Sequence, residues 1–513
     1  MVRISRKPLL PDDYYSVLFK EQKITIDEDV TNNVEECFNF LVKFSNNKII
    51  YGVNTGLGPM AQYRIEDKDQ ISLQYNLIRS HAAGSGEPLS ADCVKAAMIS
   101  RLKSLSLGYS GVHVDAIKLL EILINKNIIP FIPQHGGVGA SGDLVQLSHL
   151  ALNLIGEGEA YHNGKIHKVK DLYQRLGVTP LKIRLREGLG LINGTSVMSG
   201  IGIVNILLSK HILNWSVIAS TLINEIVESF DDHFSVVLNN VKKHKGQQVI
   251  AAAMREITKD SSLIKKRDGL LFNGKIEEKI FKQKIQEYYS LRCVPQILGP
   301  IYDTIINTEE VLINEVNSVN DNPVVDVEGS TVYHGGNFHG DYVSFEMDKL
   351  KVAITKLSML AERQINFLMN NKLNDILPPF VNLGTLGLNL GMQGTQFTAT
   401  STVGENQTLS NPMYVHSIPS NNDNQDIVSM GTNAALLTKK VIDNTFEVLS
   451  IEFITIIQAI DKLEISDKLS SQSRNVYKSL RELVPVFIDD TPKYEEIKTI
   501  GTYLRKVNPD NIK

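Results

Sequence analysis

The chain has few of the residues that reveal a functional site by themselves. Only three cysteines occur in 513 residues, and Cys37, Cys93 and Cys293 are far apart and in no metal-binding pattern. An odd number of scattered thiols is typical of a reduced intracellular protein and argues against a disulfide framework. The basic N-terminus has no apolar run behind it, so no signal peptide is indicated. We therefore expect a cytoplasmic protein.

The chain also lacks an excess of charge and long uninterrupted apolar runs. Lys and Arg number 53 and Asp and Glu number 57, giving a net charge of -4, which does not favour nucleic acid or an acidic membrane surface as a partner. Residues 197–226 and 447–460 are the most apolar, but Lys210, His211 and Glu452 interrupt them. These stretches are too polar for a bilayer span, so we expect buried helices and no membrane partner.

The strongest structural pattern is helical periodicity in the second half of the chain. Apolar residues spaced by three or four positions predict one helix roughly 40 Å long. Residues 196–230 and 432–462 are apolar on several faces, so they must be surrounded by other helices or other chains. The sequence predicts a mainly α protein with a long-helix bundle that oligomerises through its core. The periodic residues are Val343, Met347, Leu350, Ile354, Leu357, Ala361, Ile365 and Leu368.

The first part of the chain is predicted to be rich in loops. Residues 48–60, 130–145 and 187–196 contain many Gly, Asn, Thr and Pro residues, a composition typical of irregular segments that carry function. The simplest division is an N-terminal loop-rich domain over residues 1–195 and a long-helix domain over residues 196–513. The second domain is expected to end in a small helical cap.

Residues 139–143, Gly-Ala-Ser-Gly-Asp, form the most unusual of these loops. Glycine has the least hindered amide nitrogen and tolerates strained dihedral angles. Attack of the Gly142 nitrogen on the Ala140 carbonyl closes a five-membered ring around Ser141. The ring then loses one water, and the Ser141 hydroxyl leaves as a second water. The product carries an electrophilic exocyclic methylene and requires no bound cofactor. The simpler interpretation is a glycine-rich turn in which Asp143 caps the following helix.

Three other segments combine polar residues with a possible chemical role. Tyr51 lies in a glycine-rich loop, where it is either a packing residue or a phenolate base on a lid. Asn193 could cap the next helix, or hold an electrophile or a carboxylate. Gln286, Tyr289 and Arg292 are spaced at i, i+3 and i+6, which would place them on one helix face. The planar guanidinium of Arg292 suits a carboxylate.

Further polar loops adjoin the predicted helices. Ser80-His81 follows a helical segment, where the histidine is either structural or able to bind the polar tip of a substrate side chain. The others are residues 320–323, 335–340, 405–407 and 424–426. Each of them alone would be interpreted as helix capping, but together they exceed what capping requires.

Together these residues resemble a known family, the MIO-dependent aromatic amino acid ammonia-lyases. The signature-like segment runs from Gly136 to Leu144 around Ala140-Ser141-Gly142 and continues to Leu147-Ser148-His149. The family includes the histidine, tyrosine and phenylalanine ammonia-lyases and related aminomutases, and the resemblance extends from about residue 20 to about residue 460. It implies a mainly α fold of the ammonia-lyase (fumarase/aspartase-like) type. It also implies a homotetramer in which three chains form each active site.

The resemblance further implies a cofactor and a set of residue roles. Ala140, Ser141 and Gly142 would become 4-methylidene-imidazole-5-one (MIO), with no external cofactor and no metal. Tyr51 would remove the β-proton of the substrate. Asn193 and Tyr289 would position the MIO ring and the amine, and Arg292 would bind the substrate carboxylate, giving an α,β-unsaturated acid and ammonia. The other expected substrate-binding residues are Ser80, His81, Gln286, Phe338, Glu405, Asn424 and Gln425.

Two features of the resemblance point to different aromatic substrates. Ser80-His81 is similar to the pair in histidine ammonia-lyases, whereas Asn424-Gln425-Asp426 is similar to the tyrosine and phenylalanine enzymes. Across its length the chain most resembles short bacterial tyrosine ammonia-lyases, and His81 could bond a phenol as readily as an imidazole. We predict elimination of ammonia from L-tyrosine to give p-coumarate. The alternatives are elimination from L-histidine to give urocanate and an aromatic 2,3-aminomutase reaction.

Overall fold

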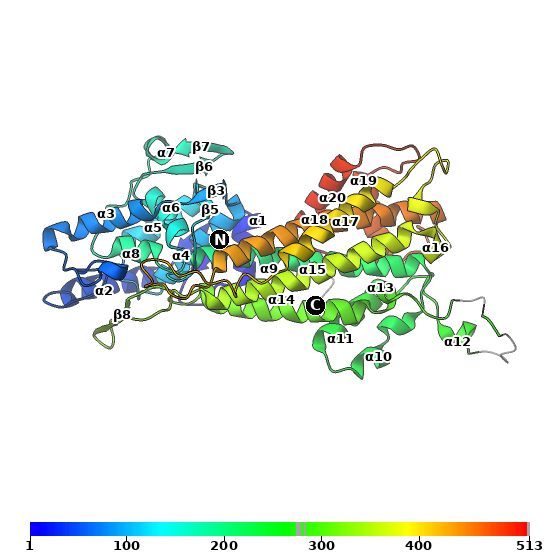
Figure 1. Ribbon diagram of the computed structural model, residues 1–513, viewed down its shortest axis with the longest axis horizontal. Helices are drawn as coiled ribbons and strands as arrows, with labels where there is room; N and C mark the ends of the chain where they lie inside the picture. Colours follow the sequence, from blue (N-terminus) through cyan, green and yellow to red (C-terminus); the bar gives the residue numbers. More distant parts are fainter. Residues whose placement is uncertain (273–278, 282–283, 510–513) are drawn as a thin grey trace. The chain divides into compact units, whose positions relative to one another are not determined.

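The computed structural model describes residues 1–272, 279–281 and 284–509, and helices dominate it (Figure 1). The prediction of a mainly α protein is confirmed. The chain forms two compact units. Unit 1 comprises Met1–Leu207, Thr308–Asp348 and Pro412–Lys439, and unit 2 comprises Leu208–Asn307, Lys349–Asn411 and Lys440–Lys513. Each unit is therefore assembled from three segments that are separated in sequence. The linear division at residue 195 stays a prediction.

Unit 1 contains half of the short helices and all the β-strands of the described residues. The helices that lie wholly in it are α1 (Pro11–Phe19), α2 (Glu28–Phe44), α3 (Gln70–His81), α4 (Ala91–Ser106), α5 (Val114–Asn125), α6 (Leu144–Leu154), α7 (Val169–Leu176) and α8 (Glu187–Ile192), with the 3₁₀ turns η1 (Gly58–Met60) and η2 (Asp67–Asp69). The strands are β1 (Val2–Ile4), β2 (Ile24–Ile26), β3 (Ser85–Pro88), β4 (Ile129–Pro130), β5 (Pro133–His135), β6 (Glu159–His162), β7 (Lys165–Lys168), β8 (Val324–Asp326) and β9 (Thr331–Tyr333).

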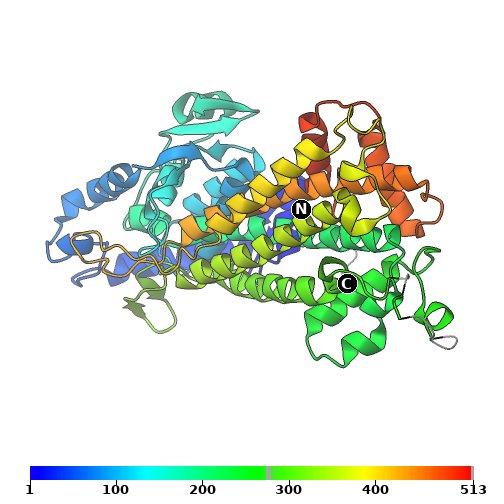
Figure 2. The same cartoon turned by 45° about the vertical axis from the view of Figure 1, so that its right-hand side comes forward.

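The strands form small sheets beside these helices. Strands β1 and β2 are parallel, with Val2 opposite Ile24, whereas β3–β5, β4–β6–β7 and β8–β9 are antiparallel. The β6–β7 hairpin, with Ala160 opposite His167, lies next to α7 in both views (Figures 1 and 2). Residues 412–430, drawn in gold in Figure 2, form a long loop without a helix or a strand. Loops rather than sheets therefore carry most of the polar residues predicted from the sequence.

The described residues form four long helices. They are α9 (Ser196–Ile226), α14 (Val294–Val316), α15 (Asp341–Met369) and α18 (Gly431–Leu463). Three of them, α9, α15 and α18, were predicted from the apolar pattern. Helix α15 has 29 residues, about 44 Å at 1.5 Å per residue, and all eight periodic residues on it have an exposed fraction of 0%. Helices α9 and α18 correspond to the predicted helices at residues 196–230 and 432–462. These three predictions are confirmed.

Unit 2 holds the remaining helices and the C-terminal part of the chain. They are α10 (Val236–Asn240), α11 (Lys245–Ile257), α12 (Arg267–Leu270), α13 (Tyr289–Arg292), α16 (Asn371–Asn374), α17 (Gln393–Leu409), α19 (Ser471–Leu483) and α20 (Tyr494–Lys506), with the 3₁₀ turns η3 (Asp231–Phe234), at the N-terminal side of α10, and η4 (Pro379–Val381). Unit 2 therefore combines short helices with segments of the long helices.

Polar residues in α9 attach the C-terminal helix. The indole nitrogen of Trp215 donates to the carbonyls of Leu504 and Val507 at 3.0 and 2.9 Å, and His211 Nδ1 is 3.0 Å from the carbonyl of Arg505. Helix α9 is the one helix of the described residues that is long and apolar enough to cross a membrane, but 94% of its most apolar window is buried within the protein. The polar groups of His211 and Trp215 are thus hydrogen-bonded inside the fold.

Candidate active site

The Gly139–Asp143 loop lies between β5 and α6 and is pressed against the turn at residues 193–195. Gly142 has φ +72° and forms an isolated parallel bridge with Gly194. A Cβ atom at Gly142 would lie 2.0 Å from the Gly194 oxygen, and the Asp143 amide donates to that same oxygen at 2.7 Å. Because both the dihedral angle and the available space exclude a side chain, glycine is required at position 142.

Two side-chain amides hold Ser141. Asn193 Nδ2 donates to the Ser141 carbonyl at 3.0 Å, and Gln425 Nε2 donates to Ser141 Oγ at 2.8 Å. The other end of the Gln425 amide is also fixed, because Ser420 Oγ donates to Gln425 Oε1 at 3.4 Å. Ala140 is 4% exposed and packs with Val428 and Met430. The carbonyl and the hydroxyl of Ser141 therefore face neutral hydrogen-bond donors beside an apolar cluster.

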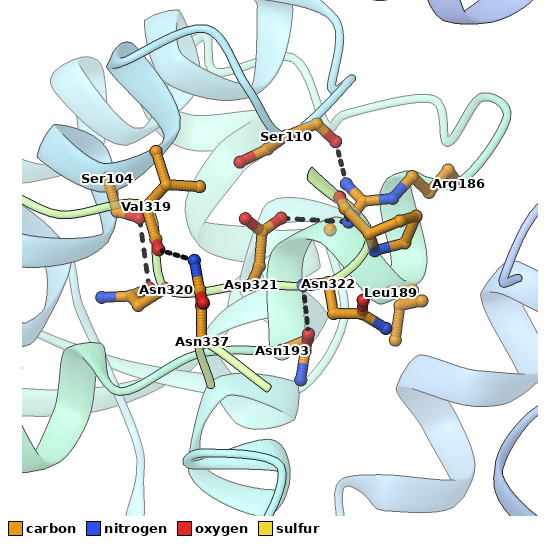
Figure 3. Close-up of polar contacts among 12 residues, drawn as sticks. Ser104, Ser110, Arg186, Leu189, Asn193, Val319, Asn320, Asp321, Asn322 and Asn337 are labelled. Atoms are coloured by element: carbon orange, nitrogen blue, oxygen red, sulfur yellow. Dashed lines mark hydrogen bonds and ion pairs between the residues drawn. The ribbon is translucent and has the colours of Figure 1, made fainter. Parts of the chain in front are cut away.

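The Asn193 amide is oriented by a second loop of unit 1 (Figure 3). Asn193 Oδ1 accepts a hydrogen bond of 2.8 Å from the Asn322 amide. Asn322 Oδ1 in turn accepts one of 2.8 Å from the Gly335 amide. Because a backbone N–H can pair only with the oxygen of the Asn193 side chain, the Nδ2 group must face Ser141. Asn193 stands at the C-terminus of α8, and its side chain is bound to these loops instead of capping α9.

Asp143 joins the loop to a helix that begins more than fifty residues later. Its Oδ2 atom accepts from the amides of Val197 and Met198 at 2.8 and 2.9 Å, and the Thr432 hydroxyl donates to Oδ1. In the simpler interpretation Asp143 caps the helix directly after it, and Asp143 does stand at the N-cap position of α6. Its carboxylate, however, makes no capping bond to α6 and instead accepts from the amides of α9. Burial raises the pKa of Asp143 to about 6, against the opposing effect of these three hydrogen bonds.

Backbone contacts fix the start of the same loop. Gly340 N and Ser429 Oγ both donate to the Gly139 carbonyl at 3.1 Å, and Met430 N donates to the Val138 carbonyl at 3.0 Å. The Gly335–Gly340 segment was recognised in the sequence, but Ser429 and Met430 were missed. Met430 makes this contact with its backbone, which leaves no signal in the identity of the residue. Ser429 uses its side-chain hydroxyl, but it lies outside the polar segments that the sequence indicated.

The Tyr51 loop is closed by the phenol itself. Gly58 N donates to Tyr51 Oη at 2.9 Å, and Gly56 N donates to the Tyr63 carbonyl at 2.8 Å. Tyr51 is half-buried, and its own amide is 3.4 Å from His334 Nε2. The phenolic oxygen of Tyr51 is thus held within unit 1, the unit that contains the Ala140–Gly142 triplet.

Ser80 and His81 are the last two residues of α3. His81 Nδ1 lies 3.0 Å from the Leu77 carbonyl and 3.0 Å from Ser80 Oγ. Since a carbonyl only accepts, Nδ1 of a neutral ring carries the hydrogen and Nε2 is left as an acceptor. The loop after His81 is bound to α6, because the Gly84 amide donates to His149 Nε2 at 3.1 Å. His149 belongs to the signature-like segment but was not among the predicted site residues.

Gln286, Tyr289 and Arg292 come together in unit 2, although not on a helix face. Helix α13 contains only Tyr289–Arg292, and Gln286 precedes it, so the expected i, i+3, i+6 helix was wrong. Arg292 Nη1 nevertheless donates to Gln286 Oε1, and the Arg292 guanidinium lies 4.8 Å from the centre of the Tyr289 ring. All three line a cavity of about 470 Å³ that also contains Tyr288 and Arg363.

The other predicted site residues lie in exposed or half-buried positions. Glu405, on α17 in unit 2, accepts from Asn444 Nδ2 at 2.6 Å and is 3.7 Å from Lys440 Nζ. Asn424 is exposed in the turn before Gln425, and Phe338 is half-buried in the loop that donates to Gly139. Their roles in binding substrate stay predictions.

Comparisons with known proteins agree with the features of this loop. The family model for aromatic amino acid lyases matches residues 9–482. The chain belongs to this family. The tyrosine 2,3-aminomutase of Myxococcus sp. (strain Mx-B0) is 40% identical over 452 residues, covering 86% of this chain and 85% of that protein. The histidine ammonia-lyase of Caldanaerobacter subterraneus subsp. tengcongensis is 38% identical over 458 residues, covering 89% of this chain and 87% of that protein.

The fold is also that of solved members of the family. The crystal structure of tyrosine aminomutase from Streptomyces globisporus superposes with a TM-score of 0.93 at 33% identity, covering 98% of this chain and 97% of that one. The resemblance to the aromatic amino acid ammonia-lyases is therefore confirmed. The relatives include both ammonia-lyases and aminomutases, so the family is established while the substrate is left to a proposal.

Replacing Gly142 by Ala is expected to disrupt the contact with Gly194. The added Cβ would overlap the Gly194 oxygen, and the positive φ angle would be strained, at a combined cost of about 2–4 kcal/mol of stability. Thermal unfolding measures the change. The matched control is Gly177→Ala, which has φ +64° and no atom within 4 Å of the added Cβ, so only the conformational cost of about 1–2 kcal/mol applies. Equal losses in the two variants would contradict the steric argument.

The buried Asp143 carboxyl predicts a specific pH dependence of stability. Its pKa is about 6 in the folded protein and near 3.8 when unfolded, so the folded state binds the proton more tightly. Its contribution is therefore greatest below the unfolded pKa, declines as the pH rises towards 6 and is constant above that. Asp143→Asn cannot titrate. The difference in unfolding temperature, wild type minus variant, should fall between pH 4 and 6.5, and a difference that rises over this range would refute the assignment.

Proposed function

We propose that the protein eliminates ammonia from an aromatic L-amino acid, preferably L-tyrosine to p-coumarate, with MIO formed from Ala140, Ser141 and Gly142. The proposal rests on two hydrogen bonds to Ser141: Asn193 Nδ2 donates to its carbonyl, and Gln425 Nε2 donates to its hydroxyl. Such donors stabilise charge that develops on the two oxygens. A glycine-rich turn without chemistry would not need both of them.

The residues around the triplet fit the group. Gly142 has no side chain, a positive φ angle and a backbone fixed by Gly194, as ring closure by its nitrogen requires. Ala140 is buried, which limits competing attack by water on its carbonyl. Once formed, MIO would supply an electrophilic carbon that makes the substrate amine a better leaving group. Asn193, held by Asn322, would keep its N–H directed at the oxygen that derives from the Ser141 carbonyl.

The other residues would bind the substrate and move its protons. Tyr51 is the proposed base for the β-proton, and Arg292 is proposed to bind the carboxylate in the cavity it shares with Gln286 and Tyr289. We propose a homotetramer in which three chains complete each active site, as the resemblance implies. We also propose a cytoplasmic location, supported by the free thiols of all three cysteines.

The acceptor on His81 is compatible with tyrosine, and the Asn424-Gln425 pair favours it. With Nδ1–H directed at Leu77, Nε2 can accept from a phenolic hydroxyl. Histidine is a second candidate, because Ser80-His81 resembles the pair of histidine enzymes and a relative at 38% identity is a histidine ammonia-lyase. The aminomutase outcome is favoured by the relative at 40% identity, a tyrosine 2,3-aminomutase. These three outcomes yield different products and can be separated in one assay.

Incubation of the pure protein with L-tyrosine, L-histidine or L-phenylalanine, with no cofactor added, tests the proposal. We expect p-coumarate to form fastest, measured by absorbance, and β-tyrosine to be a minor product by chromatography. Faster urocanate formation would select histidine, and β-tyrosine as the main product would select the aminomutase. The intact mass should be two waters below the encoded mass in the wild type. Ser141→Ala removes the hydroxyl that must leave as water. We therefore expect this variant to fold normally and to lose almost all activity.

Tyr51→Phe separates the base from the electrophile. We expect the variant to keep the two-water mass loss but to lose turnover by about 100- to 10,000-fold, the usual contribution of a general base. The control is Tyr63→Phe, because Tyr63 lies in the same loop but is 68% exposed and contributes only its backbone carbonyl to the hydrogen bond with Gly56. Turnover by Tyr51→Phe at the rate of the Tyr63→Phe control would show that another group removes the proton.

A further inference from the structure

Two fully buried arginines lie behind the loop that orients Asn193. Arg101 and Arg186 are both 0% exposed, and Arg186 forms an ion pair with Asp321, which is also 0% exposed (Figure 3). Burying such a pair costs desolvation free energy, so it is weak support for stability by itself. Its placement suggests a second purpose.

The guanidinium of Arg186 spans the residue that fixes Asn193. Arg186 Nη2 donates to Asp321 Oδ2 at 3.1 Å and to the Pro323 carbonyl at 2.9 Å. These two acceptors belong to the residues on either side of Asn322. Arg186 Nη1 donates to the Ser110 carbonyl, so the guanidinium is also anchored on the opposite side. Arg186 therefore sets the direction of the Asn322 N–H by binding the residues on either side of Asn322, Asp321 and Pro323.

The short helix α8 connects this guanidinium to the site. Arg186 stands at its N-cap with φ +64°, an uncommon left-handed conformation for a residue with a side chain, and Asn193 stands at its C-cap. The residues at both ends of α8 thus form hydrogen bonds to the same loop. Arg186 binds residues 321 and 323, and Asn193 accepts from the amide of Asn322 at 2.8 Å. The amide oxygen of Asn193 is held there, and its N–H is left for Ser141.

A second arginine holds the preceding residue of the loop. Arg101 Nη1 donates to Asn320 Oδ1 at 3.3 Å, Ser104 Oγ donates to the same oxygen at 3.1 Å, and Arg101 Nη2 donates to the Gly190 carbonyl within α8. Residues 320–323 are therefore all hydrogen-bonded to α4 or to the two residues that cap α8. This degree of restraint exceeds what a surface connection between two helices requires.

We propose that Arg186 is a positioning residue for the Ala140–Gly142 triplet. Through the backbone of residues 321–323 it fixes the Asn193 amide so that Nδ2 donates to the Ser141 carbonyl, and it thereby governs both the conversion of the triplet and turnover. This inference rests on the proposed function. A purely structural role for the ion pair would instead lower thermal stability and leave the chemistry of each folded molecule unchanged.

Arg186→Lys tests the inference, because lysine keeps the charge but its single ammonium cannot reproduce a planar fork to three separate acceptors. We expect a folded protein in which a smaller fraction of chains shows the two-water mass loss. The kcat per converted chain should fall at least about tenfold, in line with the sensitivity of catalysis to small misplacements, while KM changes less than about threefold. The substrate is whichever amino acid the wild type converts fastest.

The control is Arg184→Lys, two residues earlier, which replaces an arginine paired with Asp115 at 2.8 Å near the surface and should match the wild type. If Arg186→Lys does not fold, the double variant Arg186→Met with Asp321→Leu provides a second test, because it removes both charges and leaves no unpaired carboxylate. We expect it to fold and to show the same reduced conversion and kcat.

The outcomes separate the two proposals. A wild-type mass equal to the encoded mass would overturn the proposed function. A normal wild-type mass, with folded Arg186 variants that convert and turn over like the Arg184→Lys control, would overturn this inference alone. Failure of both Arg186 variants to fold would assign the pair a purely structural role and overturn it as well.

Discussion

The contact between the backbones of Gly142 and Gly194 is the constraint on which the candidate site depends. A side chain at either position would collide with its surroundings: a Cβ at Gly142 would meet the Gly194 oxygen at 2.0 Å, and a Cβ at Gly194 would meet Arg101 Nη1 at 2.5 Å. This close approach lets Asp143 reach the first amides of α9 and lets Asn193 reach Ser141. A loop, a turn and a helix terminus are therefore held as one hydrogen-bonded unit.

The groups that contact Ser141 are neutral, and their direction is set by further contacts. A side-chain amide can be turned to present either its oxygen or its nitrogen, so its use as a donor requires that the oxygen be bound elsewhere. Asn322 N binds the oxygen of Asn193, and Ser420 binds that of Gln425. Charged residues act one step further away, where Arg186 and Asp321 are paired out of contact with water. Orientation at the site is thus supplied by hydrogen bonds, and charge supports the loops that provide them.

The long helices and the loops make different demands on the sequence. In α15 a repeated apolar residue every three or four positions is sufficient, because each of these side chains only needs to be covered. In α9 the polar residues Trp215 and His211 are buried as well, and each finds a carbonyl near the end of the chain. The same helix therefore combines an apolar core role with specific attachment points for α20.

The sequence by itself determined the helical class, the positions of α9, α15 and α18, and the unusual triplet, since periodicity and a five-residue motif are local properties. It also indicated the loops that bear Tyr51, Asn193 and Asn322. Only the tertiary structure decided what these residues touch. Gln425 meets Ser141 across 284 positions, the Asp143 carboxylate binds the amides of α9 and not those of the adjacent α6, and Arg292 meets Gln286 without a connecting helix. Such pairings depend on how distant segments approach each other, and neither residue type nor spacing along the chain encodes that approach.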